Sequence, residues 1–185
     1  MARKLSLSQC MIVKDEEENI RRALSWGQGI VCEQIVVDTG SVDKTVAIAE
    51  SMGAKVYHYK WENDFAAAKN FAISKATGDW IAFLDADEYF LEEGREGVKK
   101  LLTFLAGYPT EQQPEAIRCD MMHLGEAGNI FSTTKQDRFF RNSGKIFYKN
   151  RIHEILTHTS GRKLLIYDIG GELPIYHTGY ATGES

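Results

Sequence analysis

Trp80-Ile81-Ala82-Phe83-Leu84-Asp85-Ala86-Asp87-Glu88 is an apolar run that passes directly into a group of carboxylates. The continuous apolar part, 80–84, is typical of a strand that is covered on both faces of a parallel sheet. Open sheets of this kind bind ligands at the carboxyl ends of their strands, which is where Asp85 and Asp87 stand. Residues two apart in extended backbone point the same way, so both carboxylates are expected to approach one site.

The two carboxylates predict a divalent-metal site. Hard oxygen ligands suit Mg²⁺ or Mn²⁺, and these ions bridge carboxylates to phosphates. The alternative is a solvated acidic turn that caps the next helix. The apolar strand before Asp85, together with Asp38 at the end of another apolar strand, favours the metal site.

Strands and helices alternate around this segment. We expect strands at 5–13, 33–38, 54–61 and 79–84, and helices at 15–26, 44–52, 64–76 and 92–106. Four such repeats predict an α/β fold, Rossmann-like, with a mostly parallel sheet and helices on both faces. After Pro109 the alternation stops, and a mostly β C-terminal part is predicted from extended segments at 116–124, 129–140, 145–155 and 163–176. No linker separates the two parts, so we expect one domain over residues 1–185.

Local patterns give two helix starts and part of a core. Asp43 and Asp64 are expected N-caps, because a side-chain oxygen at that position accepts a bond from a free backbone N–H. Phe65, Ala68 and Ala72 are expected on the buried face of the helix 64–76.

Composition excludes several classes of protein. The 185 residues carry 22 Lys and Arg against 26 Asp and Glu, and a net charge of -4 argues against sequence-independent nucleic-acid binding. No apolar run approaches the roughly 18 residues of a transmembrane segment, and the N-terminus has no signal-peptide core. Cys10, Cys32 and Cys119 have no zinc spacing and are expected to be buried thiols in a reducing compartment. We expect a cytoplasmic protein, either free or at the inner face of the membrane.

Other polar residues are weaker candidates when each is taken alone. The Asp38 carboxylate can accept bonds from a nucleobase or a ribose, or can organise the turn Thr39-Gly40-Ser41 that follows it. For Lys69, Arg138 and Arg141 a solvated side chain is the simpler interpretation. The two arginines fall on opposite faces of an extended segment, so they need not converge. His177 alone is at best a weak signal for a metal ligand.

Taken together and in order, several pieces of the chain resemble family 2 glycosyltransferases with the GT-A fold. The pieces are 8–17 (SQCMIVKDEE), 36–45 (VVDTGSVDKT), 63–70 (NDFAAAKN), 78–80 (GDW) and 84–88 (LDADE). The resemblance continues more loosely through 138–141 (RFFR), 153–154 (HE) and 177–180 (HTGY).

The resemblance implies an inverting transfer from a nucleotide-diphosphate sugar, with a UDP-sugar as the expected donor. It implies that Asp38 contacts the nucleoside base and that Asp85 and Asp87 form the metal-binding motif. In that motif Asp87 is the more direct metal ligand, and Asp85 meets the ribose or a metal-bound water. His177 resembles a late histidine that completes metal or diphosphate binding. Lys69 stands where relatives often carry Arg and is expected among the donor-binding residues.

The resemblance also suggests which residues act in the transfer. Glu154 is the candidate general base by its order along the chain, and Asp137 is the competing candidate. A carboxylate within hydrogen-bond reach can take the proton of the acceptor hydroxyl. Arg138 or Arg141 would assist at the diphosphate, because guanidinium suits phosphate oxygens.

Residues 1–107 are expected to form the nucleotide-sugar-binding half and residues 108–185 the acceptor-side half. The acceptor is a protein, a lipid or a glycan. Relatives commonly continue beyond Tyr180, so acceptor-binding parts are expected from further sequence, a second copy in a homo-oligomer or a partner chain. The alternative function is a nucleotide-sugar-binding or scaffold module without transfer. A Rossmann dehydrogenase is disfavoured, because 14–17 (KDEE) stands where its glycine fingerprint belongs.

Overall fold

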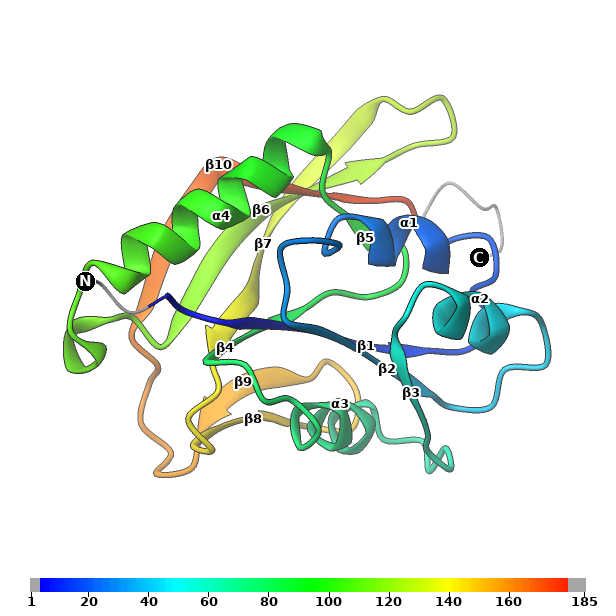
Figure 1. The fold of residues 1–185 in the computed structure, drawn as a ribbon, viewed down its shortest axis with the longest axis horizontal. Helices are drawn as coiled ribbons and strands as arrows, with labels where there is room; N and C mark the ends of the chain where they lie inside the picture. Colours follow the sequence, from blue (N-terminus) through cyan, green and yellow to red (C-terminus); the bar gives the residue numbers. More distant parts are fainter. Residues whose placement is uncertain (1–3, 180–185) are drawn as a thin grey trace.

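The computed structural model describes residues 4–179, which form an eight-stranded sheet and a separate two-stranded sheet (Figure 1). The large sheet has the order β3-β2-β1-β4-β7-β6-β10-β5, and β8 pairs with β9. The strands are β1 (Leu7–Val13), β2 (Glu33–Asp38), β3 (Lys55–His58), β4 (Trp80–Phe83), β5 (Glu88–Tyr89), β6 (Ala116–Leu124), β7 (Ile130–Arg141), β8 (Ile146–Lys149), β9 (Ile155–His158) and β10 (Ile166–His177). The helices are α1 (Ile20–Ser25), α2 (Thr45–Ser51), α3 (Phe65–Ile73) and α4 (Glu92–Ala106), and a 3-10 turn, η1, spans Thr110–Gln112.

The strands β1 to β4 run parallel, as the sequence predicts. Every residue of β2 is buried, because successive side chains enter two different apolar layers. Val36 packs with α1 and α2, while Ile35 and Val37 pack with α3. Full burial of each such side chain contributes about 1.5–3 kcal/mol, so both faces stabilise the sheet.

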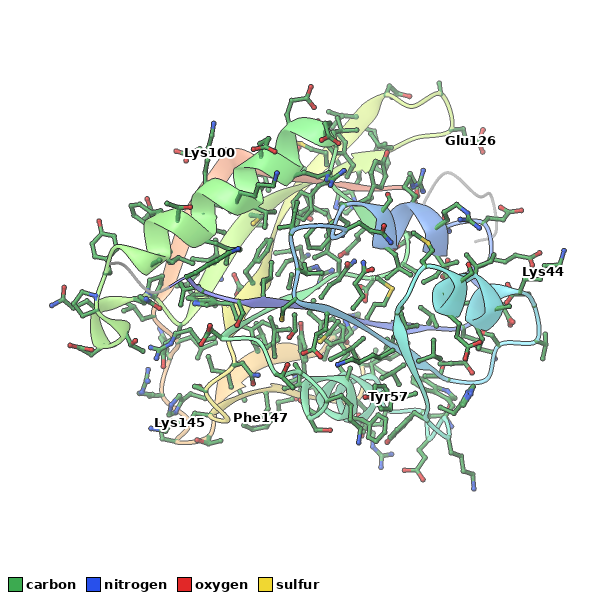
Figure 2. All side chains as sticks on the ribbon, viewed as in Figure 1. Lys44, Tyr57, Lys100, Glu126, Lys145 and Phe147 are labelled. Carbon is green, nitrogen blue, oxygen red and sulfur yellow. The ribbon has the colours of Figure 1, made fainter. Side chains whose placement is uncertain are left out.

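Helices cover both faces of the large sheet. Helices α1, α2 and α4 lie on one face, and α3 lies with β8 and β9 on the other (Figure 1). Side chains fill the space between the sheet and these layers (Figure 2). Asn70 joins α3 to β8, because its side chain donates to the Tyr148 carbonyl oxygen and accepts from the Tyr148 N–H, both at 2.8 Å.

The C-terminal part extends the same sheet. β7 pairs antiparallel with β4, β6 pairs antiparallel with β7, and β10 pairs parallel with β6. β5 lies far earlier in the chain but pairs antiparallel with the end of β10. The prediction of a mostly parallel sheet with helices, followed by a strand-rich C-terminal part, is confirmed.

Several expected elements differ in extent. The first helix begins at Ile20 instead of residue 15, because Asp15 has a φ of 55° and its carboxylate accepts from the Val42 N–H. The extended segment expected at 145–155 is two strands, because Asn150 and His153 have φ values of 80° and 55°.

Of the other local predictions, one N-cap is confirmed, and one N-cap, one core residue and one buried cysteine are wrong. Asp64 is the N-cap of α3 and accepts from the Ala67 N–H, as predicted. The N-cap of α2 is Lys44 instead of Asp43. The Asp43 carboxylate accepts a hydrogen bond from the Thr45 N–H. Phe65 is 42% exposed, so it is not a core residue. Cys10 and Cys119 are buried, whereas Cys32 is exposed, contrary to expectation.

Within residues 4–179, the structure has no helix that is both long enough and apolar enough to cross a membrane.

Candidate active site

A cavity of about 840 Å³ opens at the carboxyl ends of the parallel strands. Its walls come from the ends of β1 and β4, the loop after β2, the start of α3, β7, the β8–β9 loop and the end of β10. The lining residues are Ile12, Val13, Lys14, Glu16, Thr39, Trp61, Phe65, Lys69, Asp85, Ala86, Asp87, Gln136, Arg138, Ile152, His153, Glu154, Ile155 and His177. Both expected halves of the chain therefore contribute to this cleft.

Lys69 lies beneath the cleft and joins two carboxylates. Its Nζ is 2.5 Å from Glu154 Oε1 and 3.3 Å from Asp85 Oδ1, and only 2% of the residue is exposed. The ammonium also lies over the rings of Phe83 and Tyr148, 5.3 and 5.2 Å from their centroids. Burial alone would lower the pKa of Lys69, but the combined negative charge around it, from Asp85 first and also from Glu154, outweighs burial and raises the pKa. The side chain is therefore a charged anchor instead of the solvated lysine of the simpler interpretation.

Arg138 is the second cation at the cleft, and its side chain is 12% exposed. Its guanidinium bonds Glu88 and lies 3.3 Å from Asp85 Oδ2. Burial opposes ionisation of Asp85, yet Lys69 and Arg138 together hold the pKa of this carboxyl below its usual value. Burial raises the pKa of Glu88 to about 7, against the lowering effect of Arg138. Asp85 is thus fixed as a carboxylate between two cations.

Asp87 and His177 form a separate pair on the cleft wall. The antiparallel pairing of β5 with β10 sets His177 opposite Glu88, and Asp87 Oδ2 lies 3.1 Å from His177 Nε2. The hydrogen bond to Asp87 raises the pKa of His177 above its ordinary value. A Cβ at Gly179 would stand 2.3 Å from Asp87 Oδ2 and 2.7 Å from His177 Nε2, so only glycine leaves space beside both atoms.

The Asp87–His177 pair fits a divalent ion in chemistry and spacing. Neighbouring ligands of an octahedral ion, each about 2.1 Å from it, lie about 3 Å apart. Mg²⁺ is usually held by one or two carboxylates together with substrate phosphates. Asp85, the third expected metal residue, is instead bonded to Lys69 and Arg138. Within residues 4–179 no group of three or more His, Cys, Asp or Glu side chains is arranged to hold a metal.

Asp38 organises the turn that follows β2. Its carboxylate accepts from the backbone N–H groups of Gly40 at 3.3 Å and Ser41 at 3.0 Å, and it lies 3.2 Å from His58 Nδ1. Burial would raise the pKa of Asp38, but these bonds lower it. The side chain is 4% exposed, and its neighbour Thr39 lines the cleft in its place.

Two expected site residues lie outside the cleft. Asp137 points to the other side of β7 from Arg138, where Arg118 donates to it at 2.7 and 3.0 Å. Arg141 stands opposite Trp80 at the start of β4, and it lines a second cavity of about 420 Å³ with Lys145. Lys145 lies at the end of the molecule away from α2 (Figure 2). The alternation of side chains along β7 explains the position of Asp137, and Arg141 lies away from the cleft because it stands beside the first residue of β4.

Sequence reasoning missed three residues of this region: Glu88, His123 and Gly179. Glu88 had a visible signal, because it directly follows the two aspartates. His123 had none, because only the pairing of β6 with β10 places it beside His177. Gly179 was visible in the motif, but the contact that requires glycine depends on the folded position of Asp87.

Comparisons with known proteins agree with this architecture. The family model described as Glycosyl transferase family 2 matches residues 8–109. A TPR repeat-containing protein of Synechococcus elongatus is 39% identical over 150 residues, which cover 81% of this chain and 35% of that protein. An uncharacterized glycosyltransferase of Rickettsia felis is 42% identical over 183 residues, which cover 85% of this chain and 63% of that protein. The chain therefore spans less than two thirds of the length of these relatives.

The fold is shared with TarS of S. aureus. The TM-score is 0.66 at 17% sequence identity, over 94% of this chain and 60% of the crystallised TarS fragment 1–349. This likeness confirms the GT-A-like architecture expected from the sequence. Because the family match covers more than half of the residues, the chain belongs to glycosyl transferase family 2.

Proposed function

We propose that this chain is an inverting glycosyltransferase that moves a sugar from a UDP-sugar to an acceptor hydroxyl with the help of Mn²⁺ or Mg²⁺. The carrying observation is that one cleft holds the Asp87–His177 pair, the cation-fixed Asp85 and the loop carboxylate Glu154. TarS of S. aureus has been solved in complex with UDP and with UDP-GlcNAc, which supports the choice of donor.

The donor is held by groups on both sides of the cleft. Asp87 and His177 would hold the divalent ion, which would supply positive charge against the charge that grows on the leaving diphosphate. Asp85 presents an oxygen to the ribose hydroxyls, because Lys69 and Arg138 keep it ionised and oriented. Asp38 holds the turn after β2 in place, and this turn contacts the nucleoside through Thr39.

Glu154 is the general base. As the acceptor oxygen bonds to the anomeric carbon, its proton passes to the Glu154 carboxylate. The bond from that carbon to the diphosphate oxygen breaks on the opposite face, and the configuration inverts. Lys69 orients the carboxylate for this step through their 2.5 Å contact.

Asp87→Ala tests the donor and metal assignment. We expect Mn²⁺-dependent binding of UDP, measured by calorimetry, to be lost, because one of two protein ligands is removed, while the melting temperature without metal is kept. Glu126→Gln, an exposed carboxylate on the β6–β7 turn, is the matched control. Unchanged Mn²⁺-dependent affinity in the Asp87 variant would contradict the metal assignment. Donor binding without any transfer or hydrolysis by the wild-type chain would identify a binding module instead.

A further inference from the structure

His123 lies directly behind His177, on the side away from Asp87. It belongs to β6, whose register with β10 sets the two histidines side by side. Their Nδ1 atoms are 2.9 Å apart, and the ring planes are inclined by 86°. We propose that His123 is a positioning residue that holds the His177 ring with Nε2 directed at the metal position beside Asp87. This inference rests on the proposed function, because it concerns the same metal site.

The second nitrogen of His123 is anchored as well. Its Nε2 lies 2.8 Å from Thr134 Oγ1 on β7, and the residue is only 8% exposed. A continuous line of contacts therefore runs from β7 through β6 to β10 and ends at Asp87. Thr134, His123 and His177 stand on three neighbouring strands, so the sheet fixes the position of the His177 ring.

The protons along this line fit metal binding. A metal-binding Nε2 must offer its lone pair, so the His177 proton belongs on Nδ1, which donates to His123 Nδ1. His123 then carries its own proton on Nε2 and donates it to the Thr134 hydroxyl oxygen. With no ion bound, His177 Nε2–H donates to Asp87 and the roles along the line reverse. The line of contacts therefore accommodates the tautomer of His177 that presents Nε2 to the ion and holds the ring in place in both states.

Partners of this kind have measurable effects. Removal of a residue that orients a metal-binding histidine typically costs about 10–100-fold in metal affinity. The ring is also expected to lose orientation, because the ion must share the Asp87 oxygen that His177 Nε2 contacts. His123 touches neither the ion nor the sugar, so its effect passes through His177.

Two substitutions at His123 separate bonding from packing. His123→Phe keeps a ring of similar size and removes both nitrogens, whereas His123→Asn keeps an acceptor near the position of Nδ1. The probe is Mn²⁺ titrated into the 185-residue chain saturated with UDP, with free Mn²⁺ followed by electron paramagnetic resonance. His158→Asn is the matched control, because His158 is equally buried and its ring bonds Ser160, two residues further along the chain.

We expect His123→Phe to weaken Mn²⁺ binding by about tenfold or more and His123→Asn to restore it to within about threefold of the wild type. UDP affinity without metal and the behaviour of the His158 control should not change. Equal Mn²⁺ affinity in His123→Phe and the wild type would overturn the proposal, as would His123→Asn binding as weakly as His123→Phe. A wild-type chain that binds UDP but no Mn²⁺ would overturn this proposal together with the metal assignment. A wild-type chain that binds Mn²⁺ at this pair but no UDP would contradict the proposed function alone.

Discussion

Glu154 reaches the cleft because the backbone before it adopts positive φ at Asn150 and His153. These two residues end β8 and turn the chain, so that Glu154 meets Lys69 from α3. Non-glycine residues with positive φ cost about 1–3 kcal/mol each and persist where surrounding structure holds them. The loop therefore stores strain at the point where the proposed base is presented.

Glu154→Gln is expected to lower the rate of sugar transfer by about 10²–10⁴-fold, because an amide cannot take the acceptor proton. UDP affinity should change by less than about threefold, since the side chain keeps its volume and one oxygen. Turnover of UDP-sugar and calorimetry with UDP measure the two effects. Asp137→Asn is the comparison variant and should keep its transfer rate, because Asp137 bonds Arg118 outside the cleft. The opposite pattern would make Asp137 the base.

Gly179→Ala is expected to weaken Mn²⁺ binding by about tenfold, because the new Cβ would displace Asp87 or His177 from its present position. Free Mn²⁺ in a titration with UDP reports the change. Gly171→Ala on β10 is the control, since a Cβ there meets Asp120 Oδ2 at an ordinary contact distance of 3.7 Å. Equal affinities for the two variants would show that the space beside Asp87 is not needed.

At the scale of elements, Glu33 fastens the start of β2 to its surroundings. Its carboxylate accepts from Ser8 of β1 at 2.7 Å, from Thr77 before β4 at 2.6 and 2.8 Å, and from Lys55 of β3 at 2.8 Å. Burial would raise the pKa of Glu33, but these donors lower it to about 2. The carboxylate is thus a shared acceptor for three neighbouring parts of the sheet.

The folded-state pKa of Glu33 lies below the ordinary value of 4.5, so its stabilisation is complete above that pH. It is lost as the pH falls towards 2, and the whole effect amounts to about 3 kcal/mol. We expect Glu33→Gln to lower the free energy of unfolding at pH 7 and to flatten its decline between pH 4.5 and 2. Urea unfolding at several pH values measures both effects, with Glu126→Gln as the exposed control. Parallel curves for the Glu33 variant and the wild type would contradict the assignment.

Elements set by local pattern were predictable from the sequence, and those set by distant partners were not. The helix at 92–106 and the strand at 116–124 follow their hydrophobic spacing and have the expected bounds. The helix expected from residue 15 is shorter, because the loop after β2 captures Asp15. In the site, Asp85 and Asp87 were visible as neighbours in one segment. Lys69, which contacts Asp85, and His123, which contacts His177, take their places from packing and strand register, which no local pattern records.

At the scale of the whole molecule, the two expected halves interlock. β7 of the second half lies directly beside β4 of the first, and β5 of the first half pairs with β10 of the second. Neither half therefore has a complete sheet of its own. The core cluster around Trp80 also contains Phe139 and Ile175 from the later strands.

We expect residues 1–107 expressed alone to lack a cooperative thermal transition, because the edge of β4 and one side of its apolar core would face water. Circular dichroism during heating measures this, with the 185-residue chain as the reference. A sharp transition in the fragment would show that the nucleotide-sugar-binding half folds as an independent domain.

The pairing of β5 with β10 has a further consequence once an ion is shared by Asp87 and His177. Such an ion acts as a reversible cross-link that closes a loop of about ninety residues, and a closed loop has fewer conformations to gain on unfolding. Because His177 is the last residue of β10, this strand could separate from the sheet only after the ion had dissociated. A metal-loaded chain would therefore resist unfolding and proteolysis from this edge, by an amount that grows with the logarithm of the ratio of free ion to its dissociation constant.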